Sequence, residues 1–244
     1  MRAPDRLPYS SLAPTVVALA MAGSGLGAWD YHLGLAVAPV SAWAAAVAMG
    51  RWLQRIGGLQ GPLACILLGP LAVAAAVAPW QPACNVVDSA ALWALGPAAA
   101  GLWGLGIGAL AALAPSRGGA RAVLAALYAG AALPAAAHFL QSPQIDAYLP
   151  HAGHVAGALY EDAVAVGWRD VAYRLADLAW LIPVIAVASE LRTRDQPWSL
   201  AALRRLARGH RAIGWALWTA ALAMATAAWL AGEQRWRTPQ AGFE

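Results

Sequence analysis

Histidine and acidic side chains gather in one stretch of the sequence, PHAGHVAGALYEDAVAVGWRD. His151 and His154 stand three positions apart, and imidazole together with carboxylate groups can hold a zinc ion. The zinc-peptidase signature, however, has a glutamate directly after the first histidine and the second histidine at the fourth position on, whereas Ala152 follows His151 here. Gly153 also disfavours a helix that would bring both imidazoles to one face. We therefore predict no metal at His151, His154 and Glu161, and no bound cofactor.

The stretch belongs to a predicted outer loop, 141–171, which is the longest connection of the chain. Loops beyond about 12–15 residues are usually functional or disordered. We expect its polar side chains to pack the loop or to contact a partner. With one histidine from the preceding helix, these functional candidates are His138, His151, His154, Tyr160, Glu161 and Asp162.

Three charged residues follow the loop at helical spacing. Asp170, Arg174 and Asp177 lie four and three residues apart, which places them on one helix face. Asp177 falls about two turns into a predicted membrane span, where an unpaired charge is expensive. We therefore expect Arg174 to pair with Asp177. Two roles stay open: a structural ion pair that orders the outer loop, or a relay for protons or substrate, and His138 suits either one.

Other common chemistries have no signature in this sequence. We find no Ser-His-Asp order, no P-loop and no dinucleotide-binding glycine pattern. The string GLWGLGIG does place Gly101, Gly104 and Gly108 at spacings of three and four. Inside an apolar segment this spacing predicts close approach of a neighbouring helix rather than a nucleotide site.

The composition indicates which kind of structural element positions these residues. Hydrophobic residues make up 61% of the 244 residues and charged residues only 11%, whereas soluble domains carry about 25% charged residues. A bilayer accepts this apolar surface, and about 20 apolar residues suffice for a helix to cross it. We predict an all-α, polytopic transmembrane helix bundle that forms one domain over 1–244. Its seven apolar spans are about 11–29, 33–50, 62–79, 91–114, 122–140, 172–189 and 212–231.

The arginines predict the orientation of the bundle, because cytoplasmic loops are enriched in positive charge. All 16 basic residues are arginine. With the N-terminus inside, the opposite side holds only Arg169, Arg174, Arg235 and Arg237. This indicates a bacterial inner-membrane protein with its C-terminus outside, and the loop positions argue against nucleic-acid binding. The cytoplasmic side holds Arg2, Arg6, Arg51, Arg55, Arg117, Arg121, Arg192, Arg194, Arg204, Arg205, Arg208 and Arg211.

Tryptophans and prolines add local detail to this bundle. Ten tryptophans fall mostly near span ends and are interpreted as an interfacial belt, because the indole ring prefers the headgroup level: Trp29, Trp43, Trp52, Trp80, Trp93, Trp103, Trp168, Trp180, Trp198 and Trp236. A ring platform for a quinone or a sugar is the alternative. Five prolines fall within spans, where neighbouring helices can satisfy the freed carbonyls, so we expect kinks at Pro39, Pro70, Pro97, Pro134 and Pro183.

The residue pattern of a predicted cytoplasmic segment, 198–211, indicates an amphipathic helix. Ser199 is suited to cap it, with Leu200, Leu203 and Leu206 on one face and Arg204, Arg205 and Arg208 on the other. Such a helix is expected to lie on the anionic inner leaflet.

Several short motifs resemble a family of bacterial membrane domains that precede a periplasmic, zinc-peptidase-like domain in longer proteins. That family has an Asn-Cys or nearby pair after its third span, a loop of the form His-Pro-x-x-Gly-x-x-x-Gly-x-x-Tyr-Asp-Glu, and an arginine early in the next helix. The acidic order is reversed here, which is a departure from the pattern. The matching residues are Cys84-Asn85, then His151, Gly153, Gly157, Tyr160, Glu161 and Asp162, and then Tyr173-Arg174-Leu175.

The resemblance implies a membrane domain with no activity that can be carried over, because the family's zinc-binding helix belongs to a soluble domain not present in these residues. The chain would be a stand-alone version or the membrane part of something larger. Our leading hypothesis is a non-catalytic inner-membrane domain whose periplasmic loop docks or positions a periplasmic or membrane protein partner. The alternatives are a permease-like transporter subunit that needs a separate ATPase, and an intramembrane metalloenzyme.

Overall fold

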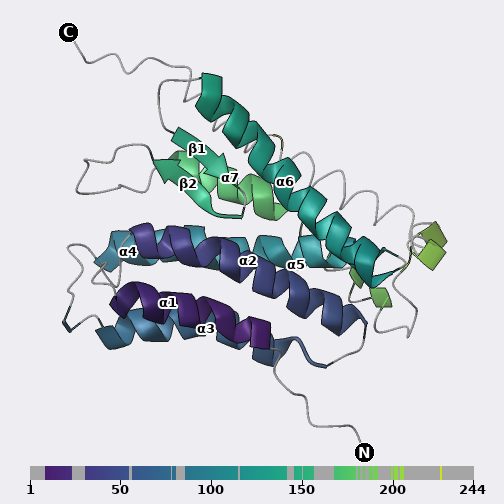
Figure 1. Ribbon diagram of the computed structural model, residues 1–244, viewed down its shortest axis with the longest axis horizontal. Coiled ribbons are helices and arrows are strands. Elements are labelled where there is room, and N and C mark those ends of the chain that lie inside the picture. The colour runs from purple at the N-terminus through teal and green to yellow at the C-terminus, as the bar shows by residue number, and fades with distance from the viewer. Residues whose placement is uncertain are drawn as a thin grey trace, which may run out of the picture.

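A computed structural model gives the fold of the chain. The structure describes residues 9–23, 31–54, 57–77, 79–80, 86–114, 116–141, 146–149, 151–156, 168–179, 181, 184, 187–188, 190–191, 199, 201–202, 204–205 and 226. Their architecture is a helix bundle that carries one small β-hairpin (Figure 1). The helical segments are η1 (Tyr9–Leu12), α1 (Ala13–Gly23), α2 (Tyr31–Leu53), α3 (Gln60–Val77), α4 (Val86–Trp93), η2 (Ala94–Ala98), α5 (Ala99–Ala111), α6 (Arg117–Gln141) and α7 (Trp168–Ala179).

Three helical segments in the described part of the chain are long and apolar enough to cross a membrane: Gly34–Leu53, Gln60–Val77 and Ala90–Ala111. Large apolar side chains also point away from the bundle, such as Leu68 on α3 and Leu133 on α6. A helix that is apolar all round belongs either in a protein core or in a bilayer, and outward apolar side chains on such helices suit contact with a lipid bilayer. The chain is a helical membrane protein, as the composition predicts.

The helix at the centre of the bundle changes its winding near Pro97. α4, η2 and α5 are continuous, and η2 is a π-helical turn with Pro97 inside it. The N–H of Ala99 is directed to the carbonyls of Ala94 and Gly96. In a regular α-helix it would bond to the carbonyl of Leu95. The π-turn, where the sequence predicts a kink, thus leaves the Leu95 carbonyl without its α-helical donor.

Among the described elements, helices α2 and α5 share the most extensive contact, and glycines of α5 bring the two backbones close together. A Cβ added at Gly104 would lie 2.7 Å from the carbonyl carbon of Ala42 and closer still to its oxygen, and one added at Gly108 would lie 2.7 Å from the Cα of Ala46. The close approach predicted for these glycines is confirmed. Gly104 faces Ala42 and Gly108 faces Ala46, so the residue numbers increase in the same direction along both helices. α2 and α5 therefore run parallel to each other.

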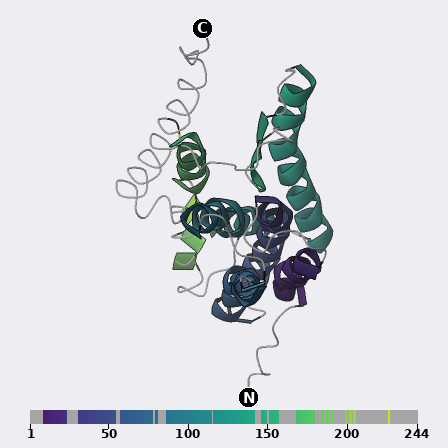
Figure 2. The same ribbon diagram turned by 90° about the vertical axis from the view of Figure 1, so that its left-hand side faces the viewer.

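The hairpin was not predicted from the sequence. Strands β1 (Asp146–Leu149) and β2 (Gly153–Ala156) pair antiparallel, with Asp146 opposite Ala156 and Tyr148 opposite His154. The hairpin lies between α6 and α7 and against the bundle (Figures 1 and 2). Part of the predicted outer loop is therefore folded back onto the helices.

The α2–α5 contact gives the first testable prediction. Gly104→Ala should destabilise the protein by about 1–3 kcal/mol, because the new methyl group meets the backbone of α2 rather than a flexible side chain. Thermal unfolding in detergent micelles measures the effect. Gly130→Ala on α6 is the matched control, since a Cβ there meets nothing within 4 Å, and it should leave the melting temperature unchanged or raise it. Equal melting temperatures for the two variants would contradict the close packing.

Candidate functional site

His151 lies in the turn of the hairpin and packs against two aromatic rings of the bundle. Its ring centroid is 6.0 Å from that of Trp103 on α5 and 5.3 Å from that of Tyr128 on α6. Trp103 and Tyr128 meet edge to face, with centroids 5.3 Å apart and planes at 82°, an arrangement that aromatic pairs favour. The outer loop is thereby joined to two different helices through one side chain.

The backbone of the turn sets the position of His151. The N–H of Ala152 donates to the carbonyl of Leu149 at 3.0 Å, which closes a four-residue turn around His151. Ala152 itself is buried, so this residue of the tip packs into the protein.

The surroundings of His151 disfavour a positive charge on its ring. Burial lowers the pKa of His151 below its ordinary value, and the guanidinium of Arg174 lowers it further. The imidazole is therefore neutral at pH 7. In the described part of the structure, His151 Nδ1 and Tyr128 Oη are both buried without a hydrogen-bond partner.

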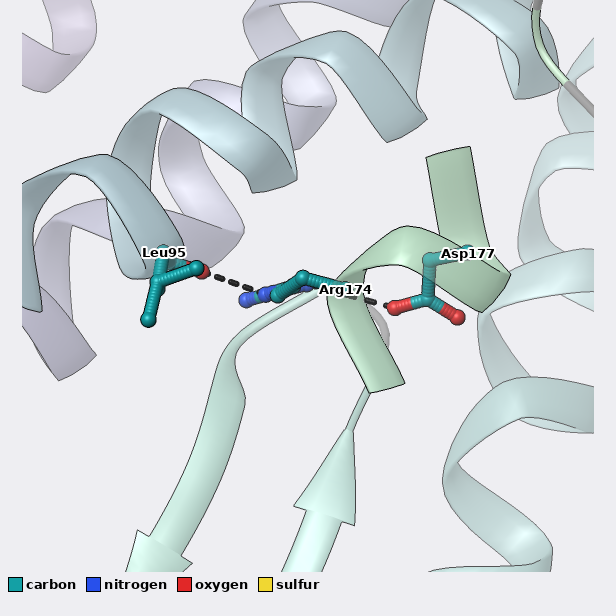
Figure 3. A network of polar contacts seen from close by, with 3 residues as sticks. All are labelled: Leu95, Arg174 and Asp177. Atoms are coloured by element: carbon teal, nitrogen blue, oxygen red, sulfur yellow. Dashed lines mark hydrogen bonds and ion pairs between the residues drawn. The ribbon is translucent and has the colours of Figure 1, made fainter. Parts of the chain in front are cut away.

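Arg174 on α7 connects the next helix to the bundle. Its side chain is almost fully buried, and its Nε donates to the Leu95 carbonyl of η2. Its Nη1 lies 3.4 Å from the carboxylate of Asp177. Figure 3 shows the guanidinium between these two groups. The carbonyl that the π-turn releases thus receives a charged donor from another helix, and charge-assisted hydrogen bonds are the stronger kind.

Helix α7 buries its charged face and exposes an apolar residue. Asp170, Arg174 and Asp177 are buried or partly buried, while Leu175 is 52% exposed. Soluble proteins show the reverse, whereas ionisable residues of membrane helices usually face the interior of the bundle. The ion pair expected between Arg174 and Asp177 is present, and Asp170 stands in the first turn of the same helix, where the helix dipole favours a carboxylate.

The structure describes the remaining predicted site residues only in part. His154 lies in β2 and the backbone of His138 in α6; their side chains, like Tyr160, Glu161 and Asp162, lie outside the described residues. His151 and His154 occupy a turn and a strand, so no helix brings their imidazoles to one face. The described residues contain no group of three or more His, Cys, Asp or Glu side chains that could hold a metal ion.

The sequence reading missed three members of the site. Trp103 was assigned to a span end, yet it is 5% exposed and packs on Tyr128 and His151, so its assignment to an interfacial belt is wrong. Tyr128 carried no signal except its isolated polar group within an apolar run. The Leu95 carbonyl is a backbone atom, and the only hint of its availability was Pro97 two residues later.

At the predicted cytoplasmic segment, one local expectation is confirmed. The N–H of Ala202 donates to Ser199 Oγ at 3.2 Å, which is the bond of an N-cap. Ala202 is buried, whereas Arg204 and Arg205 are exposed. The polar side of this short segment thus faces away from the protein.

No protein-family model, curated protein or solved structure matches this chain. The side chains around His151 and Arg174 therefore have to indicate the function on their own.

Arg174 provides the prediction for this site. Arg174→Ala removes the donor to Leu95 and the cation beside Asp177, and should destabilise the protein by about 3–5 kcal/mol, as the loss of one partner of a buried pair does. Adding Asp177→Asn should recover part of this loss, because it removes the uncompensated charge. Melting temperatures in detergent test both variants, with exposed Arg121→Ala as the control. An Arg174→Ala protein that melts with the wild type would refute the anchoring role.

Proposed function

We propose that this protein is a non-catalytic membrane domain that holds its outer loop in a fixed position for a protein partner. One observation carries the proposal: both sides of the loop are fastened to the same helical segment, α4–η2–α5. His151 packs on Trp103, and Arg174 donates to the Leu95 carbonyl. The segment 157–167, which contains Tyr160, lies between these two anchors in the sequence.

Fixed anchors make such a segment a better docking element. Binding orders the loops at an interface, and this ordering weakens the affinity unless the loop is already held in place. The chemistry of the described anchors agrees with a positioning role, because Arg174 is engaged by Leu95 and Asp177 and the His151 ring packs against two aromatic rings. The resemblance of the loop motifs suggests the partner, a soluble periplasmic domain of the zinc-peptidase type.

The topology belongs to the same proposal: seven spans, with the N-terminus in the cytoplasm of a bacterium. Parallel packing of α2 and α5 supports it, since α3 must then return across the membrane between them. Arg51 in the last turn of α2 lies at the end of the bundle where α6 begins with Arg117. In Figure 1 the segment around 199–205 lies at this end too. Positive charge gathered at one end is what a cytoplasmic face requires.

A fusion experiment tests the topology. Alkaline phosphatase is active only outside the cytoplasm, so its fusion after Glu244 should be active in a bacterial host and a fusion after Gln54 should be inactive. The Gln54 site follows α2, at the end that carries Arg51. An active Gln54 fusion would mean that the bundle has the opposite orientation in the membrane. An inactive Glu244 fusion would mean that the number of spans is even.

A transport component is the second candidate, and the hairpin favours it. Irregular backbone at membrane depth is tolerated where it is buried in protein or lines a water-filled cavity. Transporters also place broken helices and polar groups near the bilayer midplane. The π-turn at Pro97 and the buried polar atoms of Tyr128 and His151 have this character. Such a subunit would need a separate ATPase.

Site-specific crosslinking in the native host separates the two candidates. A photoreactive phenylalanine analogue at Tyr160 should crosslink one protein, whereas the same group at Leu140, an exposed residue at the end of α6, should not. The purified partner should then bind wild type, and replacement of 157–163 by glycine and serine should abolish binding without lowering the melting temperature. Failure of Tyr160 to crosslink any protein would contradict docking. Solute uptake into liposomes that contain the chain and an ATPase would support transport.

A further inference from the structure

The turn of the hairpin reaches deep into the bundle. Trp103, which contacts His151, lies about 20 Å along the helix from Ala90 and about 12 Å from Ala111, at a rise of about 1.5 Å per residue. Tyr128, the other contact, lies close to the middle of α6. The hairpin therefore places an ionisable side chain well inside the length of the candidate membrane span Ala90–Ala111 and beside the middle of α6.

The hairpin depends on the bundle for its position. Among the described residues, its two strands of four residues pair with each other alone, and an isolated two-stranded hairpin is marginal in stability. β1 lies along α6, and β2 touches α2, η2 and α7. The ring contacts of His151 with Trp103 and Tyr128 are the described side-chain contacts that fix the tip, so the state of this imidazole determines whether the tip stays docked.

The groups that face His151 offer little to balance a positive charge. α5 contributes the Trp103 ring and α6 the Tyr128 phenol, which is uncharged. α7 carries Asp170 and Asp177 as well as Arg174, and the Arg174 guanidinium, which lies 3.4 Å from the Asp177 carboxylate, is the charge of this helix that acts on His151. The sequence of η2 has no charged residue, and the one arginine of α2, Arg51, is in its last turn.

We propose that the β1–β2 hairpin is a proton-released latch: neutral His151 holds the tip against Trp103 and Tyr128, and protonation of His151 detaches it from the bundle. Protonation puts an N–H on Nδ1, which is buried among the described residues without an acceptor, and a second cation beside Arg174. The aromatic rings could attract an imidazolium through their faces, but they are tilted by 42° and 48° to it rather than stacked, which weakens that attraction.

The direction of the pH dependence follows from linkage. Burial and Arg174 lower the pKa of His151 in the docked hairpin, so the detached hairpin binds more protons. Docking is therefore fully favoured above the ordinary histidine pKa of about 6.5 and is lost as the pH falls below it.

Thiol labelling in lipid nanodiscs tests the latch independently of any partner or solute. With Cys65 and Cys84 replaced by alanine, Ala152→Cys reports on the tip, and Gln54→Cys, at an exposed position after α2, corrects for the pH dependence of the reagent. The labelling rate at 152 divided by that at 54 should rise as the pH is lowered from about 7.5 to about 5.5. The rise should approach about tenfold, because pH 5.5 lies about one unit below the ordinary histidine pKa. In a His151→Gln background the ratio should stay constant.

A ratio that does not change with pH, or an equal rise in the His151→Gln background, would overturn the latch. Hydrogen exchange of the unmodified protein covers the case in which His151→Gln fails to fold. Peptides from 146–156 should lose protection on acidification relative to peptides from α5, after correction for intrinsic exchange rates. Protection that both segments retain equally at low pH would also refute the proposal.

Discussion

The hydrogen bond from Arg174 to the Leu95 carbonyl joins α7 to the central segment α4–η2–α5, and two constraints on the structure meet in it. On one side is a backbone constraint: the π-turn around Pro97 directs the Ala99 N–H to other carbonyls and leaves that of Leu95 to be satisfied from elsewhere. On the other side is a charge that a membrane bundle must bury and pair. One guanidinium answers both needs, since it donates to Leu95 and lies beside Asp177 (Figure 3). The start of α7 is thereby fixed in depth and rotation against α4–η2–α5.

The position of the hairpin follows from this fixed frame. α6 and α7 are joined by the outer loop, and the hairpin within it lies between these two helices and against the bundle (Figure 1). Folding part of the loop into strands satisfies backbone groups that could not be left bare among apolar helices. His151 then packs against Trp103 and Tyr128 as an uncharged ring. The proposed proton release acts on this hairpin, and the proposed docking segment 157–167 follows it directly in the sequence.

Local rules of sequence explain which parts could be predicted. The Arg174–Asp177 pair, the cap at Ser199 and the close approach at Gly104 and Gly108 each depend on spacings of three or four residues in one helix. Apolar runs likewise identified the helices, three of which have the length and apolarity of a membrane span. The hairpin depends instead on contacts between residues far apart in the chain, such as His151 with Trp103.

Residues missed by sequence reasoning share that non-local character. Trp103 belongs to an apolar run whatever its depth, and only the packing of α6 and the hairpin against α5 makes it a buried contact rather than an interfacial anchor. The Leu95 carbonyl has no side-chain signature at all. Its availability follows from the winding of η2, which the sequence marks only with Pro97.

Solid-state NMR in lipid bilayers tests most directly whether the outer loop is part of the bundle interior. Protein labelled with 15N in histidine and 13C in tyrosine should show a through-space correlation between the His151 imidazole and the Tyr128 ring, whose centroids lie 5.3 Å apart. Loss of that correlation in His151→Gln assigns it to this pair. A spectrum at neutral pH without any correlation that depends on His151 would show that the hairpin does not dock on α6, and would contradict this placement of the loop.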